Sequence, residues 1–229
     1  NSSEGIFEIQ FDRSKLNSFY TMFRSRPRFV ASAYVTDPDN GLYKADIIDP
    51  TNKDIRGDGG AARFGDGLIW KYIGTDPDNL RAAEESFAHW IVYRYADILL
   101  MKAEALALTN KGQDALDLVN RIRQRAHALS STAQNVDPSN TEALCDYILE
   151  ERGREFAFEG KRWYDVLRNA KRNNYKRLDI LLNMVSTTVP GNLQQSAIAK
   201  TKDPNSHYFP IYQYELQTDK NLVQNPFYK

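Results

Sequence analysis

The sequence has little of several features that would assign it to a special class of protein. A single cysteine among its 229 residues excludes a disulfide scaffold. Thirty basic and thirty acidic side chains give a formal net charge of zero, so no overall field attracts the chain to nucleic acid. No apolar run approaches the roughly 20 residues that a membrane-spanning helix needs. Because 41% of the residues are hydrophobic and 26% are charged, we expect a globular domain with an ample core.

Signatures of catalysis and of metal binding are also scarce. The sequence contains no G-x-S-x-G, no H-E-x-x-H and no phosphate-binding loop. The three histidines, His89, His127 and His207, are scattered and share no metal-ligand spacing. An oxygen-rich stretch at 37–40 is followed by Gly41, which breaks the spacing of a calcium loop and leaves calcium binding open. We therefore expect no cofactor and name no metal-binding residues, and calcium alone stays undecided.

Aromatic residues, in contrast, are abundant. Thirteen Tyr, eleven Phe and three Trp make up 12% of the chain. A core absorbs many such rings, but exposed rings are also platforms on which the C–H faces of sugars stack. The stretch from about 28 to 67 is rich in turn-forming residues and has no sustained hydrophobic period. Loops of this length are usually functional or mobile, so this stretch is a candidate for a binding site.

The hydrophobic pattern predicts short strands before a helical part. Apolar residues alternate over 5–11, 67–73 and 89–95, which indicates strands, and a short helix is expected over 80–88. The chain after about residue 175 is punctuated by proline and glycine. We expect it to be an irregular tail that wraps the helices.

The central part is predicted to consist of helix pairs. Helices are expected over 95–109 and 113–129, with Gly112 suited to a helix end. Small residues in this pair are spaced as in tetratricopeptide repeats, and 141–170 is predicted to form a second pair. On the first helix, Ile98, Met101, Ala105 and Leu108 form an apolar stripe that Leu99, Ala103 and Leu106 widen, so we expect most of this helix to be buried.

Two charged stretches each allow a structural and a functional interpretation. Glu151, Glu155 and Glu159 recur every four residues, which is typical of a salt-bridged helix face, although a catalytic acid/base pair has the same spacing. The basic stretch 161–177 fits a solvated helix flank, or contact with nucleic acid or an acidic partner. Cys145 lies inside a predicted helix and is expected to be a core thiol.

Four segments make the pattern more specific. They are YRYADILLMKAEAL at 93–106, ALDLVNRIRQRA at 115–126, ILEERGREFAFEGKRWYDVLR at 148–168 and YFPIYQYELQTDKNLVQNPFY at 208–228. Together with NSSEGIFEIQF at 1–11, they resemble the C-terminal part of the SusD/RagB family, which comprises surface nutrient-binding lipoproteins of the Bacteroidetes outer membrane. The chain begins at Asn1 with neither a Met nor an apolar signal segment. We therefore expect a mature or truncated product without the family's N-terminal part.

The resemblance implies a mainly α fold, a tetratricopeptide-like α-α superhelix with irregular loops and a few short strands packed on it. Within 1–229 it implies a strand and variable ligand-loop region at 1–75, two helix pairs at 93–170 and a wrapping tail at 175–229. The core aromatic residues that it implies are Tyr95, Phe156, Phe158 and Trp163. The buried or half-buried charged residues that it implies are Glu151, Arg152, Arg154 and Glu155.

The function implied by the resemblance is non-catalytic binding of a glycan at the bacterial cell surface, with delivery to a SusC-like TonB-dependent transporter. The implied location is the outer membrane, through an N-terminal lipid anchor missing from this chain, and no nucleic acid is expected as a partner. Three alternatives stay open: a peptide-binding family member, a helix-repeat interaction scaffold without a small-molecule site, and a glycoside hydrolase. The sequence decides neither the ligand nor the oligomeric state.

The ligand platform of similar proteins comes from the region ahead of the helix that begins at Tyr95, here about 28–75. An exposed arc of rings in this region would support glycan capture, whereas burial of all of them would support the scaffold. The resemblance thus implies a site of three stacking rings and two polar partners, namely Trp70, Tyr43, Tyr34, Asp66 and Arg63.

Overall fold

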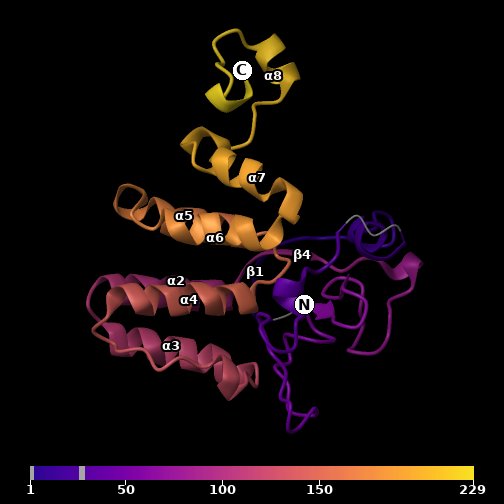
Figure 1. The fold of residues 1–229 in the computed structure, drawn as a ribbon. Coiled ribbons are helices and arrows are strands. Elements are labelled where there is room, and N and C mark those ends of the chain that lie inside the picture. The colour runs from indigo at the N-terminus through magenta and orange to yellow at the C-terminus, as the bar shows by residue number, and fades with distance from the viewer. Residues whose placement is uncertain (1–2, 26–28) are drawn as a thin grey trace. The chain divides into compact units, whose positions relative to one another are not determined.

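The computed structural model describes residues 3–25 and 29–229, and Figure 1 shows the order of the helices and strands along them. The chain divides into two compact units, Asn1–Arg162 and Trp163–Lys229. The fold is mainly α, as predicted. Within the described ranges, no helix is both long and apolar enough to cross a membrane.

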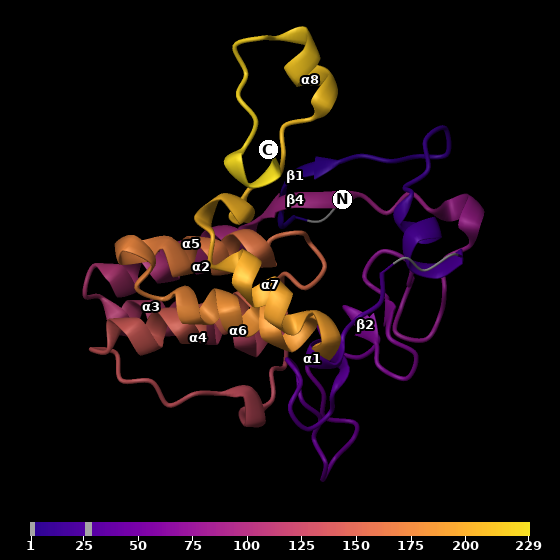
Figure 2. The ribbon, with the colours of Figure 1, turned by 45° about the horizontal axis from the view of Figure 1, so that its top comes forward.

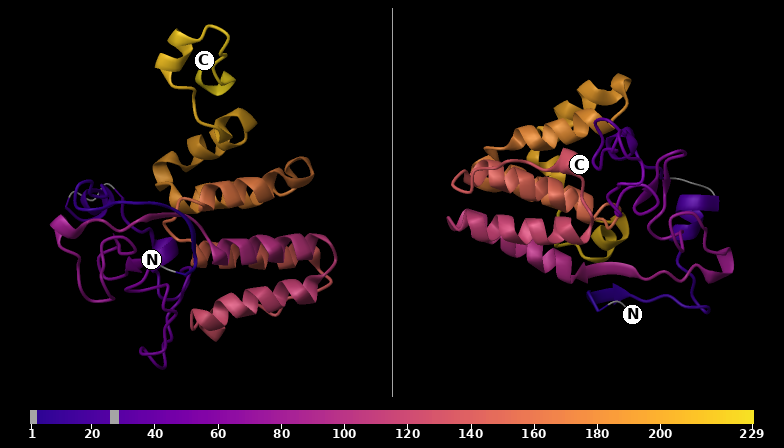
Figure 3. Two further views of the ribbon diagram at one scale, coloured as in Figure 1. Left: turned by 180° about the vertical axis from the view of Figure 1, so that it is seen from behind. Right: turned by 90° about the horizontal axis from the view of Figure 1, so that it is seen from below.

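Three helices form the frame of the first unit. Helix α2 (Tyr95–Leu108) packs against both α3 (Gly112–Arg125) and α4 (Thr141–Glu155), and Figure 3 shows the three from behind and from below. Each of them matches a helix predicted from the sequence. The Asn140 side chain accepts a hydrogen bond from the Ala143 amide at 3.1 Å, so α4 begins with the N-cap expected at this position.

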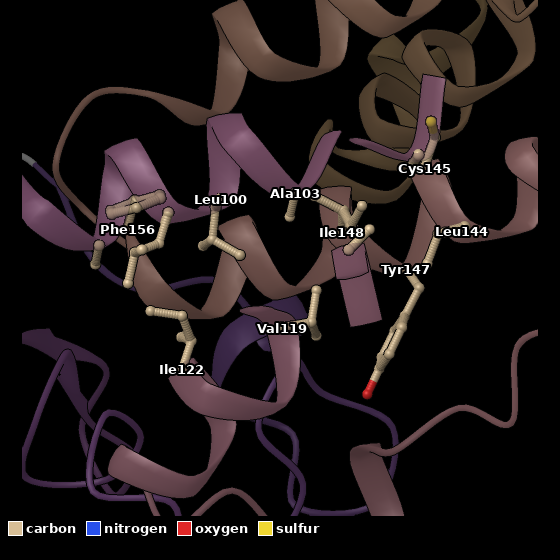
Figure 4. Close-up of a cluster of buried hydrophobic side chains, with 13 residues drawn as sticks. Leu100, Ala103, Val119, Ile122, Leu144, Cys145, Tyr147, Ile148 and Phe156 are labelled. Carbon is tan, nitrogen blue, oxygen red and sulfur yellow. The ribbon is translucent and has the colours of Figure 1, made fainter. Parts of the chain in front are cut away.

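The space between these helices is filled by an apolar core. Figure 4 shows Leu100, Ala103, Val119, Ile122 and Ile148, which come from all three helices and are at most 2% exposed. Alanines at the helix crossings let the backbones approach closely, as the tetratricopeptide-like spacing predicted. The thiol of Cys145 is also buried in this cluster, which confirms its predicted place.

The buried side of α2 differs from the predicted one. Ile98, Met101 and Leu108 are 42%, 42% and 46% exposed, whereas Leu99 and Leu100 are buried. The predicted burial is therefore wrong for Ile98, Met101 and Leu108 and is confirmed for Leu99 and Ala103. Apolar residues surround almost the whole circumference of this helix, so their period could not distinguish the face that packs against α3 and α4.

The expected core aromatic residues have different environments. Phe156 is 3% exposed, which confirms its core position. Phe158 and Trp163 are half-buried. Tyr95 is 44% exposed, so its predicted core position is wrong, since it begins α2 on the side away from the core.

Two small antiparallel sheets belong to the first unit. Strand β1 (Gly5–Ile9) pairs with β4 (Trp90–Arg94), and Figure 2 shows them side by side. Strand β2 (Ala62–Arg63) pairs with β3 (Leu68–Ile69) in a short hairpin. The first and last predicted strands are confirmed. The middle one shrinks to β3, because the chain turns immediately after it.

Short helical turns complete this unit. They are η1 (Thr21–Ser25), α1 (Ala33–Thr36), η2 (Ala83–Glu85) and η3 (Ser130–Thr132). The helix predicted over 80–88 is reduced to the three residues of η2. Long-range side-chain contacts, rather than regular elements, position most of the loop stretch before α2.

The second unit contains more helix than expected. It consists of α5 (Arg162–Tyr175, which begins at the boundary), α6 (Leu178–Thr188), α7 (Gln194–Thr201), α8 (Gln213–Thr218) and the short turns η4 (Gly191–Leu193), η5 (Pro204–His207) and η6 (Pro226–Tyr228). The predicted irregular tail is therefore wrong. The apolar residues of α6 have helical spacing, but the prediction gave more weight to the nearby proline and glycine than to this spacing. The wrapping of this tail around the helices stays a prediction.

Candidate functional site

The charges predicted to pair on α4 form a buried ion cluster. The side chains of Glu151, Arg154 and Glu155 are 0%, 6% and 2% exposed, which confirms the predicted burial. Their partners come from distant parts of the sequence. We call the group the α4 ion cluster, and its members are Asp54, Arg56, Lys71, Arg94, Arg123, Arg125, Glu151, Arg154, Glu155 and Glu159.

Glu151 lies at the centre of this cluster and receives three guanidinium groups. Its carboxylate is 2.7 Å from Arg56 Nη1, 2.9 Å from Arg123 Nη1 and 3.0 Å from Arg154 Nη1. Arg56 also donates to both oxygens of Asp54, at 2.9 and 2.6 Å. Because Arg56 belongs to the loop stretch and Arg123 to α3, the carboxylate joins both segments to α4.

Glu155 joins β4 to α4 in the same way, and its carboxyl group is strongly ionised. It pairs with Arg94, with Arg125 and with Arg56, the last at 3.0 Å. Burial by itself would raise the pKa of Glu155, but the charges of Arg94 and Arg56 outweigh it and lower the pKa to about 2. A carboxyl group that loses its proton so readily is unsuited to the role of a general acid. Because Glu151 and Glu155 are buried and engaged by guanidinium groups, the charges at this spacing form a buried ion-pair network.

A pocket of about 310 Å³ opens beside this cluster, and it contains one of the predicted rings. Tyr34, on α1, is 38% exposed there. This volume lies at the lower end of the roughly 300–1,000 Å³ of ligand pockets. We call it the Tyr34 pocket, and it is lined by Tyr34, Asn40, Gly41, Leu42, Lys44, Ser131, Thr132, Ala133, Gln134, Glu150 and Arg154.

One wall of the Tyr34 pocket is a tightly closed loop. The Leu42 amide donates to the Tyr34 carbonyl at 2.7 Å, and the Gly41 amide donates to the Asp37 carbonyl at 2.9 Å. The Asp37 carboxylate accepts from the amides of Asn40 and Asp39, at 3.0 and 2.8 Å, which lowers the pKa of Asp37. A Cβ atom at Gly41 would lie 2.3 Å from the Asp37 carbonyl oxygen, so this turn requires glycine.

The α4 ion cluster fixes this loop to the helices. Arg154 Nε donates to the Leu42 carbonyl at 2.9 Å, and the Tyr43 hydroxyl donates to the Arg154 carbonyl at 2.8 Å. On the opposite wall, Arg123 Nη2 donates to the Thr132 hydroxyl at 3.1 Å. The buried charges thus set the width of the pocket, because the same two arginines contact Glu151 and both walls.

The structure places two of the predicted rings in the interior. Tyr43 is 1% and Trp70 is 2% exposed. The indole Nε1 of Trp70 donates to the Asp76 carbonyl at 2.8 Å, and the Arg63 guanidinium lies 4.7 Å from the centre of the indole ring. The predicted exposure of Tyr43 and Trp70 is therefore wrong, because hydrogen bonds and neighbouring side chains hold both rings inside.

The two predicted polar partners belong to the turn of the β2–β3 hairpin. Arg63 forms an ion pair with Asp66, whose carboxylate also accepts from the Leu68 amide at 3.2 Å. The hydrogen bond from Arg63 lowers the pKa of Asp66. Gly67, with a φ of 70°, completes the turn. Neither Arg63 nor Asp66 is among the residues that line the Tyr34 pocket, and ligand binding by this pair stays a prediction.

A second pocket, of about 370 Å³, lies between β1, β4 and the loop that contains Arg56. Its floor carries Arg56, Lys71 and Arg94, but each of these cations already contacts a carboxylate. Burial lowers the pKa of Lys71 although Glu159 lies 2.7 Å from its ammonium group. With its charged groups engaged in pairs, this pocket offers a ligand fewer free donors than the Tyr34 pocket does.

Sequence reasoning missed most of the Tyr34 pocket. Gln134 is a hundred positions from Tyr34, and no local pattern brings them together. Asn40 and Lys44 lie in the turn-rich stretch, where Asp37 followed by Asn40 did signal a turn. No group of three or more histidine, cysteine, aspartate or glutamate side chains arranged to hold a metal occurs in the part of the chain that the structure describes.

Comparisons with known proteins agree with this architecture. A sequence model described as the SusD family matches residues 51–228. SusD-like protein P2 of Formosa agariphila is 40% identical over 103 residues, which cover 43% of this chain and 20% of that protein. A SusD superfamily protein from Bacteroides fragilis aligns with 100% of this chain, with a TM-score of 0.64 and 20% identity.

A third relative carries a functional name. Surface glycan-binding protein A from Bacteroides thetaiotaomicron aligns with 97% of this chain, with a TM-score of 0.54 and 21% identity. At these identities the two solved structures establish a likeness of fold. This chain covers 52% of the length of each of them.

Proposed function

This chain belongs to the SusD family, and from that membership we propose that it contributes to a non-catalytic glycan-binding site at the Tyr34 pocket. The observation that carries the proposal is the combination found in this pocket. A partly exposed aromatic ring lies beside amide and hydroxyl groups. Sugars present apolar C–H faces to such rings and hydroxyl groups to such polar side chains.

The ring and its surroundings are already ordered for binding. Arg162 Nη2 donates to the Tyr34 hydroxyl at 3.3 Å, and the Tyr34 carbonyl closes the loop through Leu42. The amide group of Gln134 is held by Glu150 at 2.8 Å on the other wall. A site whose groups are fixed before the ligand arrives loses less entropy on binding.

The family supports the wider role that we propose for the whole protein. One protein of the same fold is named a surface glycan-binding protein. We propose that the protein containing this chain captures an oligosaccharide at the outer membrane of a bacterium, to which a lipid anchor attaches it. The captured glycan would then pass to a SusC-like TonB-dependent transporter, and weak, reversible binding suits such a transfer.

Affinity electrophoresis with a panel of soluble polysaccharides tests the proposal. We expect at least one polymer to retard the 229-residue chain, and the Tyr34→Ala variant to be retarded less. The control is Tyr93→Ala, because Tyr93 is 47% exposed but lies on β4, outside the Tyr34 pocket. Retardation that is strong and equal in the Tyr34→Ala variant would show that the site is elsewhere.

Two of the three predicted rings, Tyr43 and Trp70, are buried while Tyr34 is exposed, so a second candidate, an interaction scaffold without a small-molecule site, also has support. Exposed apolar side chains on the β1–β4 sheet fit a protein partner, since Ile6 and Phe7 are 57% and 56% exposed. If no polymer of the panel retards the chain, the scaffold becomes the better proposal.

A further inference from the structure

We infer that the Tyr34 pocket takes an acidic saccharide, one that carries a carboxylate or a sulfate ester, and that Lys44 binds its anionic group. The inference rests on the proposed glycan binding and adds the chemical class of the ligand. Its basis is a cation at the pocket that has no anionic partner among the residues that the structure describes.

The acidic residue that lines this pocket already has partners. Glu150 is the acidic residue that lines it, and its carboxylate accepts from Gln134 Nε2 at 2.8 Å and from Arg154 Nη2 at 3.3 Å. The neighbouring Glu151 is fully buried and surrounded by three guanidinium groups. Neither carboxylate forms an ion pair with the further cation at this pocket.

Lys44 is that further cation. Its ammonium group makes one long hydrogen bond, 3.4 Å from the Ser131 carbonyl oxygen. No carboxylate in the described ranges lies within ion-pair distance of it, although the chain as a whole has as many acidic as basic residues. An ammonium group with three donors and one weak contact retains the capacity to bind an anion.

The position of Lys44 is fixed on both sides. The Leu42 carbonyl before it accepts from Arg154, and the Ala45 amide after it donates to the Pro38 carbonyl at 2.7 Å. Between these contacts Lys44 adopts a φ of 54°, a left-handed conformation that is unfavourable for a side chain without glycine's freedom. The surrounding loop therefore holds a charged residue at the pocket in a conformation that its type does not prefer.

The three kinds of group match three features of an acidic sugar. The ring of Tyr34 suits a C–H face, the amides of Asn40 and Gln134 suit hydroxyl groups, and Lys44 suits the anion. The volume of about 310 Å³ suits a short saccharide better than a large folded ligand. A neutral sugar would leave Lys44 without a partner.

Two matched pairs of probes test the inference. The first is polygalacturonate against its carboxyl-reduced, neutral counterpart, and the second is dextran sulfate against dextran. We expect the 229-residue chain to bind one acidic member about fivefold or more tightly than its neutral partner in affinity electrophoresis. The pair that shows the larger preference identifies the anionic group as a carboxylate or a sulfate. The preference should decrease as salt is added, because the charge pair is accessible to solvent.

Variants of Lys44 connect this preference to the pocket. Lys44→Asn removes the charge with a residue that tolerates the left-handed conformation, so it should fold, and it should abolish the preference. Lys44→Arg should retain most of it. Lys102→Gln removes an exposed lysine charge from α2, outside the pocket, and should leave the preference unchanged.

Three results would overturn the inference, and they are distinguishable from one another. Equal binding of acidic and neutral members, unaffected by Lys44→Asn, would leave the glycan site in place and refute the acidic ligand. Equal loss in Lys44→Asn and Lys102→Gln would show attraction by overall charge only. Absence of binding to all four polymers would refute the acidic ligand, and absence of binding to the whole polysaccharide panel would refute the proposed function together with the inference.

Discussion

The helix frame of α2, α3 and α4 and the loop stretch before it are stabilised in different ways. The frame buries a continuous apolar cluster and keeps its predicted helix boundaries to within a few residues. The loop stretch from 29 to 89 contains α1, η2 and the two short strands β2 and β3, and it has smaller apolar clusters. Its connection to the frame runs largely through charged groups, above all Arg56 and Lys71.

The difference shows that buried ion pairs, rather than regular secondary structure, attach the loop stretch to the helix frame. Ladder hydrogen bonds satisfy the backbone of a helix or sheet locally, whereas an irregular loop needs partners from elsewhere. Arg154 of α4 supplies such a partner to the Leu42 carbonyl, while Glu151 and Glu155 hold the Arg56 side chain of the loop. The Tyr34 pocket lies where the α4 ion cluster contacts the loop, so the stability of the cluster and the shape of the pocket are coupled.

Removal of the central carboxylate should have the largest effect. Glu151→Ala leaves Arg56, Arg123 and Arg154 buried without a shared anion. We expect the free energy of unfolding in urea to fall by about 3–5 kcal/mol. In hydrogen exchange, amides of the loop stretch should lose protection before those of α2, because the frame retains its apolar core.

A surface glutamate provides the control for this experiment. Glu84, in η2, is exposed, and Glu84→Ala should change the free energy of unfolding by less than about 0.5 kcal/mol. Simultaneous loss of protection in the loops and in α2 would contradict the comparison, since it would make the cluster part of one cooperative core.

Acid should have the second-largest effect, because it protonates Glu155 and so weakens its ion pairs. The folded pKa of Glu155, about 2, lies below its ordinary value of 4.5. Its contribution to stability is therefore complete above pH 4.5 and is lost as the pH falls toward 2. The loss amounts to about 3 kcal/mol, and thermal unfolding followed by circular dichroism between pH 2 and pH 6 measures it. Glu155→Gln should be less stable at neutral pH and should show a smaller decrease in acid. Parallel pH curves for the two proteins would refute this role of Glu155.

The helix frame could be predicted from the sequence, whereas the pocket beside the loop stretch could not. The helix pairs could be predicted, because apolar residues with a period of 3.6 specify a helix locally. The buried arginine–glutamate pairs could be predicted from the family resemblance. The Tyr34 pocket could not, since its two walls are positioned by Arg154 and Arg123, which lie on separate helices. The burial of Trp70 depends on Arg63 and Asp76, which no local period reveals.

The Tyr43→Phe variant distinguishes a role of Tyr43 in stability from a role in saccharide binding. The change removes the hydrogen bond from the Tyr43 hydroxyl to the Arg154 carbonyl and keeps the ring. The free energy of unfolding should fall by about 1 kcal/mol. Saccharide affinity should change little, because Arg154 still holds the loop through the Leu42 carbonyl and the Tyr43 ring is absent from the lining of the Tyr34 pocket. The opposite result, unchanged stability with lost affinity, would restore Tyr43 to the predicted binding platform.

The Arg63–Asp66 pair should have the smallest effect. Both side chains are substantially exposed, at 37% and 43%, and exposed pairs contribute little because water and salt screen them. A double-mutant cycle with Arg63→Ala and Asp66→Ala should give a coupling below about 1 kcal/mol in urea unfolding. Affinity for saccharides should change less than about twofold in each variant, because neither residue lines the Tyr34 pocket. A tenfold loss in both would place the ligand on the β2–β3 hairpin, where the resemblance first located it, and would separate the binding surface from the loop that the α4 ion cluster holds.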